Sequence, residues 1–152
     1  MSDLTVDVGV LMSGAGVGNR KYRFPSRALM DTMKESSVAR LVMDTEGFIE
    51  HSYGKLKNNY GEWWFRRMSD LDKVHYVPRK YLDRGTQTQL QEAHFDREDC
   101  KYYVRTAASS RSKRLVSHDP DYSPSVCRIL RRRLRVSLLD ANQAGALFTT
   151  EP

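Results

Sequence analysis

The chain has 152 residues, of which 39% are hydrophobic and 29% charged. This composition predicts one folded domain spanning residues 1–152 and excludes a wholly disordered chain. No apolar run approaches the roughly 20 residues that cross a bilayer, and the first residues lack the basic opening of a secretory signal, so we expect a cytoplasmic protein without a membrane partner. The net charge of +6 favours a polyanionic partner.

Short apolar runs predict the strands. The first run contains Asp7, whose buried carboxylate would need a metal ion or hydrogen-bond donors to offset desolvation. The run before Pro78 is expected at a sheet edge, because proline removes a backbone donor. The predicted strands are residues 4–12, 39–44, 74–77, 115–119 and 134–140.

Helical patterns separate these strands. The predicted helices begin near Pro25, cover most of 48–68 with a break near Asn58, and continue at 96–109, from Ser123 or Ser125 to about 133, and at 141–148. Strands that alternate with helices predict parallel βαβ units. We therefore expect a three-layer α/β/α domain with a central, mostly parallel sheet.

Three acids are placed to converge at one edge of such a sheet, since open α/β sheets carry their sites at the carboxyl ends of the strands. Asp7 lies in the first strand, Asp119 follows the apolar run LVS, and Asp99 begins the helix before it. Each acid alone has a structural explanation: a hydrogen-bond acceptor, a helix-start residue and a turn before Pro120. Together they predict a carboxylate site for Mg²⁺ or Mn²⁺.

A dense group of cations occupies residues 111–135, and it predicts a face that contacts phosphates. A solvated helix surface is the alternative explanation. The group consists of Arg111, Lys113, Arg114, Arg128, Arg131, Arg132, Arg133 and Arg135. We expect Arg111, Lys113, Arg114, Arg131 and Arg132 to bind nucleic acid.

Three segments resemble the PIN-domain nucleases, metal-dependent ribonucleases that include toxins of toxin-antitoxin pairs. They are VDVGVLMSG at 6–14, RLVMDTEGFIEHSYGKL at 40–56 and FDREDCKYYVRTAASSRSKRLVSHDPDY at 95–122. The resemblance implies a PIN-like fold, with Asp7, Asp99 and Asp119 as metal ligands and Asp121 as an auxiliary acid. It further implies hydrolysis of RNA by metal-activated water, and it allows for an antitoxin protein partner and a homodimer.

The chain departs from the family pattern in its middle segment. Where the family usually has Glu immediately before an aromatic residue, this chain has Ser52 before Tyr53, and its nearest acid is Glu50. Glu50 is therefore the candidate for this catalytic position. Gly9, where many relatives have Asn, is a milder departure. The alternatives to an active ribonuclease are a catalytically impaired PIN-like module that binds RNA or protein, and a structural α/β module without a nucleic-acid role.

Overall fold

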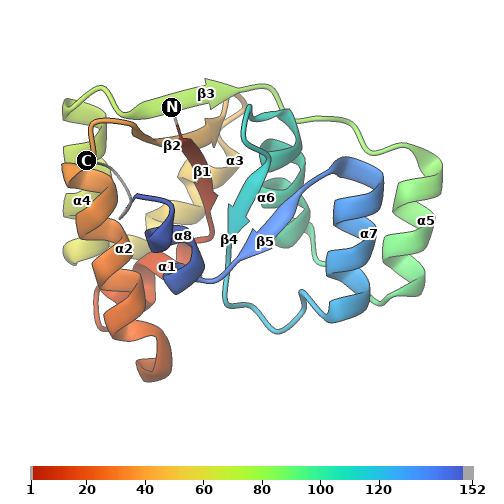
Figure 1. The fold of residues 1–152 in the computed structure, drawn as a ribbon, viewed down its shortest axis with the longest axis horizontal. Coiled ribbons are helices and arrows are strands. Elements are labelled where there is room, and N and C mark those ends of the chain that lie inside the picture. The colour runs from red at the N-terminus through yellow and green to blue at the C-terminus, as the bar shows by residue number, and fades with distance from the viewer. Residues whose placement is uncertain (1, 149–152) are drawn as a thin grey trace.

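A five-stranded, all-parallel sheet organises the fold, in the order β3-β2-β1-β4-β5 (Figure 1). This computed structural model describes residues 2–148, apart from the side chains of residues 99 and 100. The strands are β1 (Ser2–Val6), β2 (Ala39–Asp44), β3 (Val74–Val77), β4 (Arg114–Val116) and β5 (Ser137–Leu139). The α/β class with a parallel sheet flanked by helices, predicted from the sequence, is confirmed.

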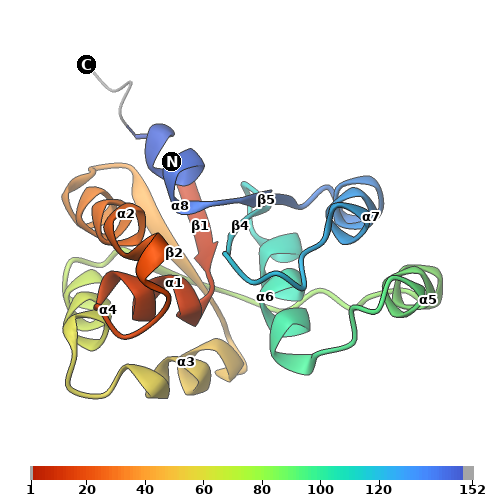
Figure 2. The same cartoon turned by 90° about the horizontal axis from the view of Figure 1, so that it is seen from below.

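Helices follow the strands and cover the sheet. They are α1 (Val8–Gly14), η1 (Arg20–Tyr22), α2 (Arg23–Glu35), α3 (Phe48–Ser52), η2 (Tyr53–Leu56), α4 (Tyr60–Asp70), α5 (Arg84–Glu92), α6 (Glu98–Ser109), α7 (Pro124–Leu134) and α8 (Ala141–Ala146). Helix α6 packs on β1, β2 and β4, while α8 lies on the opposite side of the sheet and packs against α2 (Figure 2). None of the described helices is long and apolar enough to cross a membrane.

The buried interior holds the sheet and helices together. Leu4 and Val6 of β1 and Leu41 of β2 are almost fully buried, as are Val104 and Ala107 of α6. The small, buried side chain of Ala107 allows α6 to pack closely on the sheet. Burial of this apolar surface stabilises the fold by about 25 cal/mol per Å² and holds the strands in their places in the sheet.

Several predicted elements are confirmed. Strand β2 occupies the predicted residues 39–44, and β3 is an edge strand ending immediately before Pro78. Helix α7 is capped by Ser123, whose hydroxyl accepts a hydrogen bond from the Val126 backbone N–H.

The predicted first strand is wrong in its second half, because β1 ends at Val6 and α1 begins at Val8. The Asp7 side chain accepts the Gly9 N–H and caps α1, which favours a helix start over a continued strand. Two other predicted strands are too long: β4 stops at Val116, and β5 covers only residues 137–139. Helix α5 was not predicted, since it buries only Thr86 and Leu90 and has little apolar periodicity.

Candidate functional site

A pocket of about 430 Å³ opens at the carboxyl ends of β1 and β4, the edge seen from below in Figure 2. The turn from β1 into α1 brings Asp7 to it, and the loop from β4 to α7 brings Asp119 and Asp121. Lys55 and Arg97 also line it. We call it the acid pocket. Two of the three predicted metal ligands and the predicted auxiliary acid therefore face one space.

Asp7 holds the start of α1 in place from within the pocket. Its side chain is largely buried, and its Oδ1 accepts a hydrogen bond from the Gly9 N–H at 3.1 Å. Its Oδ2 accepts a second hydrogen bond from the Ser117 hydroxyl at 2.8 Å. Asp7 is thus a helix cap rather than a residue inside a strand.

Ser117 joins Asp7 to Asp119, which lies far from it in the chain. Its hydroxyl oxygen accepts a hydrogen bond from the Asp119 backbone N–H at 3.1 Å while the hydroxyl donates to Asp7. The Oδ1 of Asp119 accepts the Asp121 N–H at 2.9 Å, which forms the turn expected around Pro120. One serine therefore fixes the position of Asp119 relative to Asp7.

Arg97 places a positive charge among these acids. Its Nη1 lies 3.3 Å from the Oδ2 of Asp119 and 3.1 Å from the Oδ2 of Asp121. The Arg97 side chain is 53% exposed, so solvent screens both ion pairs and each stabilises the fold by at most about 1 kcal/mol. The pairing was not predicted, because no local pattern connects Arg97 to a loop more than 20 residues away.

Tyr103 lines the acid pocket, and Tyr53 contacts the end of β1 beside it. The Tyr103 hydroxyl accepts the Val8 N–H at 3.2 Å and shares a hydrogen bond of 2.8 Å with the Ser52 hydroxyl. The Tyr53 hydroxyl donates to the Val6 carbonyl at 2.6 Å. Burial raises the pKa of Tyr53 well above its ordinary value of 10, and Tyr103 and the Asp7 charge raise it further. Ser52, where the family pattern usually has Glu, therefore bonds to a tyrosine.

Glu50 does not line the acid pocket. It is exposed and lines a separate pocket of about 330 Å³ together with Tyr53 and Phe65. Asp44, at the carboxyl end of β2, is an acid that the sequence analysis missed. It is almost fully buried, and its two carboxylate oxygens accept the Phe48 and Ile49 N–H groups, so Asp44 caps α3.

Asp99 lies in the first turn of α6, and its side chain falls outside the described residues. Among the side chains that are described, no three His, Cys, Asp or Glu residues are placed to hold one metal ion. Asp7 and Asp119 remain as a pair of pocket carboxylates. Such a pair suits Mg²⁺, which is commonly held by one or two carboxylates and completes its coordination with water.

The cations predicted to bind nucleic acid lie at the opposite edge of the sheet. Arg111, Lys113 and Arg114 precede or begin β4, and Arg131 and Arg132 lie in the last turn of α7, next to the start of β5. The starts of β4 and β5 and the end of α7 lie at the amino edge of the sheet (Figure 1). The acid pocket is instead lined from the carboxyl ends of β1 and β4. The cations next to the acids are instead Lys55 and Arg97.

Comparison with protein-family models finds none that matches this chain, and comparison with curated proteins finds no significant match. The fold and the acid pocket are therefore the observations from which a function is argued.

Proposed function

We propose that this chain is a metal-dependent ribonuclease of the PIN-like kind that hydrolyses RNA at the acid pocket. The observation that carries the proposal is that Asp7 and Asp119 line one pocket and are joined through Ser117. The Asp7 carboxylate is largely buried, and a bound cation would offset the cost of burying its charge. The sequence resemblance to PIN-domain nucleases supports the same function.

The donor set suits Mg²⁺ or Mn²⁺, because both prefer carboxylate oxygens. Asp7 and Asp119 would hold the ion, with Asp99 on α6 as the third ligand and Asp121 nearby as the auxiliary acid. When bound, the ion would activate a water molecule and stabilise charge on the phosphodiester.

The neighbouring side chains have defined tasks in this proposal. Ser117 keeps Asp7 and Asp119 in a fixed relation, and Lys55, exposed on η2, contacts a phosphate of the RNA backbone. Arg97 neutralises Asp119 and Asp121 until the ion and the RNA bind. Glu50 has no task here, because it lines a different pocket.

A catalytically impaired RNA-binding module is the second candidate. Two observations favour it: Ser52 stands where the family usually has an acid and is hydrogen-bonded to Tyr103, and Arg97 already supplies a positive charge to Asp119. An antitoxin partner, a homodimer and a cytoplasmic location remain predictions from the sequence.

Incubation with labelled single-stranded and structured RNA, in Mn²⁺ and then in excess chelator, tests the proposal. We expect cleavage that chelator abolishes, and loss of cleavage with retained RNA binding in Asp119→Asn. Asp70→Asn, which changes an exposed acid on α4 outside the acid pocket, is the matched control. Cleavage that survives chelator or Asp119→Asn refutes the mechanism. Metal-independent RNA binding without cleavage favours the second candidate.

A further inference from the structure

A second pocket, of about 500 Å³, adjoins the acid pocket. Both pockets are lined by Tyr22, His118 and Asp119, so the three residues form the boundary between them. The second pocket extends from there to the start of α8, and we call it the stacking pocket. Its other lining residues include Lys21, Pro25, Leu138, Leu139, Asp140 and Asn142.

The boundary contains two stacked rings. The ring centroids of Tyr22 and His118 are 4.0 Å apart, and the ring planes differ by only 13°. The His118 ring is fixed from α8, because its Nε2 accepts the Ala141 N–H at 3.0 Å. Tyr22 ends η1, whereas His118 lies in the β4–α7 loop directly before Asp119. The Lys21 Nζ lies over the Tyr22 ring, 5.4 Å from its centroid, and a base that joins the stack on Tyr22 would take the place of this cation. The aromatic pair thus stands next to a predicted metal ligand.

We infer that the stacking pocket receives an unpaired base of single-stranded RNA, which stacks with Tyr22 and His118 while the adjoining phosphodiester lies in the acid pocket. This inference rests on the proposed function and adds a binding site for one base beside the acid pocket. Sequence-tolerant binding of single strands commonly uses aromatic side chains on which bases stack. The pocket volume lies within the range of small-molecule sites, about 300–1,000 Å³.

The walls of the stacking pocket match the two surfaces of a base. Leu138, Leu139 and Pro25 offer apolar contact to its faces. Asp140 and Asn142 are exposed and carry oxygen and amide groups that can hydrogen-bond with a base edge. In a duplex the base edges are paired and the faces are already stacked, so an unpaired nucleotide fits this pocket and a base pair does not.

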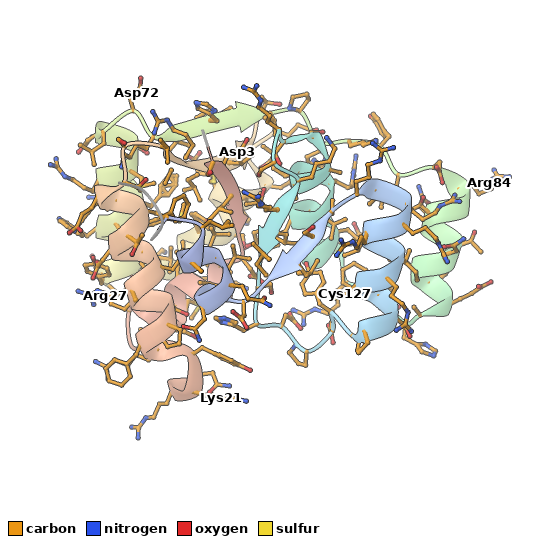
Figure 3. All side chains as sticks on the ribbon, in the orientation of Figure 1. Asp3, Lys21, Arg27, Asp72, Arg84 and Cys127 are labelled. Carbon is orange, nitrogen blue, oxygen red and sulfur yellow. The ribbon has the colours of Figure 1, made fainter. Side chains whose placement is uncertain are left out.

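The charges around the stacking pocket suit a phosphate backbone. Arg20, Lys21 and Arg23 are exposed in and next to η1, and Lys21 lines the pocket. Figure 3 shows Lys21 at the lower end of the molecule, the end at which β1 and β4 finish. Lys55 lines the acid pocket and Lys21 lines the stacking pocket, so each pocket has a cation beside it. The cations of residues 111–135 that lie at the amino edge line neither pocket.

Fluorescence anisotropy in excess chelator, where no metal-dependent cleavage occurs, tests the inference. The probes are a fluorescein-labelled single-stranded RNA and the same strand annealed to its complement. Tyr22→Ala should weaken binding of the single strand by about tenfold, since base stacking on an aromatic side chain contributes ~1–3 kcal/mol. Tyr22→Phe should bind like the unchanged protein. Trp63→Ala is the matched control, because Trp63 is a half-exposed aromatic outside both pockets.

Unchanged binding by Tyr22→Ala, or equal binding of duplex and single strand, overturns the inference. Circular dichroism checks that each variant folds. If Tyr22→Ala does not fold, Lys21→Glu is the substitute, with a larger loss of single-strand binding than of duplex binding expected, and an equal loss for both probes overturning the inference. Failure of the nuclease proposal gives a different result. Binding of the single strand that depends on Tyr22, without cleavage in Mn²⁺, refutes the nuclease proposal and supports the inference. Cleavage in Mn²⁺ together with RNA binding that does not depend on Tyr22 refutes only the inference.

Discussion

Substitution of Asp7 separates its structural role from its chemical role. Asp7→Ala removes the cap on the Gly9 N–H, which costs ~0.5–2 kcal/mol. It also removes the acceptor of the Ser117 hydroxyl, and a hydrogen bond to a charged group contributes ~1.5–3 kcal/mol. We expect the free energy of unfolding to fall by about 2–3 kcal/mol, which lowers the melting temperature by several degrees.

Asp7→Asn should behave differently. Asparagine caps helices as well as aspartate does, and its amide can donate to the Ser117 hydroxyl oxygen, which has two acceptor lone pairs. We therefore expect stability within about 0.5 kcal/mol of the unchanged protein, but loss of Mn²⁺ binding and of RNA cleavage. The contrast between a stable Asn variant and a destabilised Ala variant isolates the carboxylate charge.

Urea unfolding followed by circular dichroism measures both stabilities, and it is run in chelator so that no metal contributes. Manganese binding and RNA cleavage are then measured on the same preparations. The reasoning is refuted if Asp7→Asn is destabilised as much as Asp7→Ala, because the negative charge of Asp7 would then stabilise the fold. It is refuted equally if Asp7→Asn retains full cleavage.

Three further outcomes are expected. The buried Lys73 ammonium donates hydrogen bonds to three backbone carbonyls at the end of α2. Lys73→Met should therefore lower the free energy of unfolding, measured by urea unfolding, by about 2–4 kcal/mol. A loss below about 1 kcal/mol would contradict this expectation. Burial raises the pKa of Tyr53, so the Tyr53 hydroxyl loses its proton more readily in the unfolded chain as pH rises above 10. The free energy of unfolding should therefore decline above pH 10, and Tyr53→Phe should flatten that decline. The same pH profile of stability in Tyr53→Phe would exclude Tyr53 as its source. Arg97→Ala should tighten Mn²⁺ binding about fivefold by calorimetry, because the guanidinium competes for Asp119; weaker binding would show that it does not.

The sequence was sufficient for the parallel sheet and for the meeting of Asp7 and Asp119. Strand β2 contains the apolar run LVM at 41–43, and Pro78 marks the end of an edge strand. The two acids lie next to the carboxyl ends of neighbouring strands, which fixes them at one edge of a parallel sheet. Both inferences depend on local pattern and general topology alone.

Contacts between segments that are distant in the chain could not be predicted from local sequence patterns. The apolar residues Val8, Val10 and Leu11 fit a buried strand or a short helix, and the cap by Asp7 decides for the helix. The stacking of Tyr22 on His118 and the pairing of Arg97 with Asp119 join segments with no shared pattern.

The grouped cations of residues 111–135 illustrate the same difficulty. They are close in sequence, yet they flank β4 and β5 at the amino edge, so proximity along the chain says nothing about proximity to the acids. Lys55 could have been proposed as a pocket cation only from the path of the chain through η2.

Titration of the protein with Mn²⁺, followed by electron paramagnetic resonance of the free ion, tests most directly whether Asp7 and Asp119 form one cation site. The account predicts that the unchanged protein and Asp70→Asn bind the ion, and that Asp7→Asn and Asp119→Asn each lose the same binding event. Undiminished binding by either of these two pocket variants would contradict it.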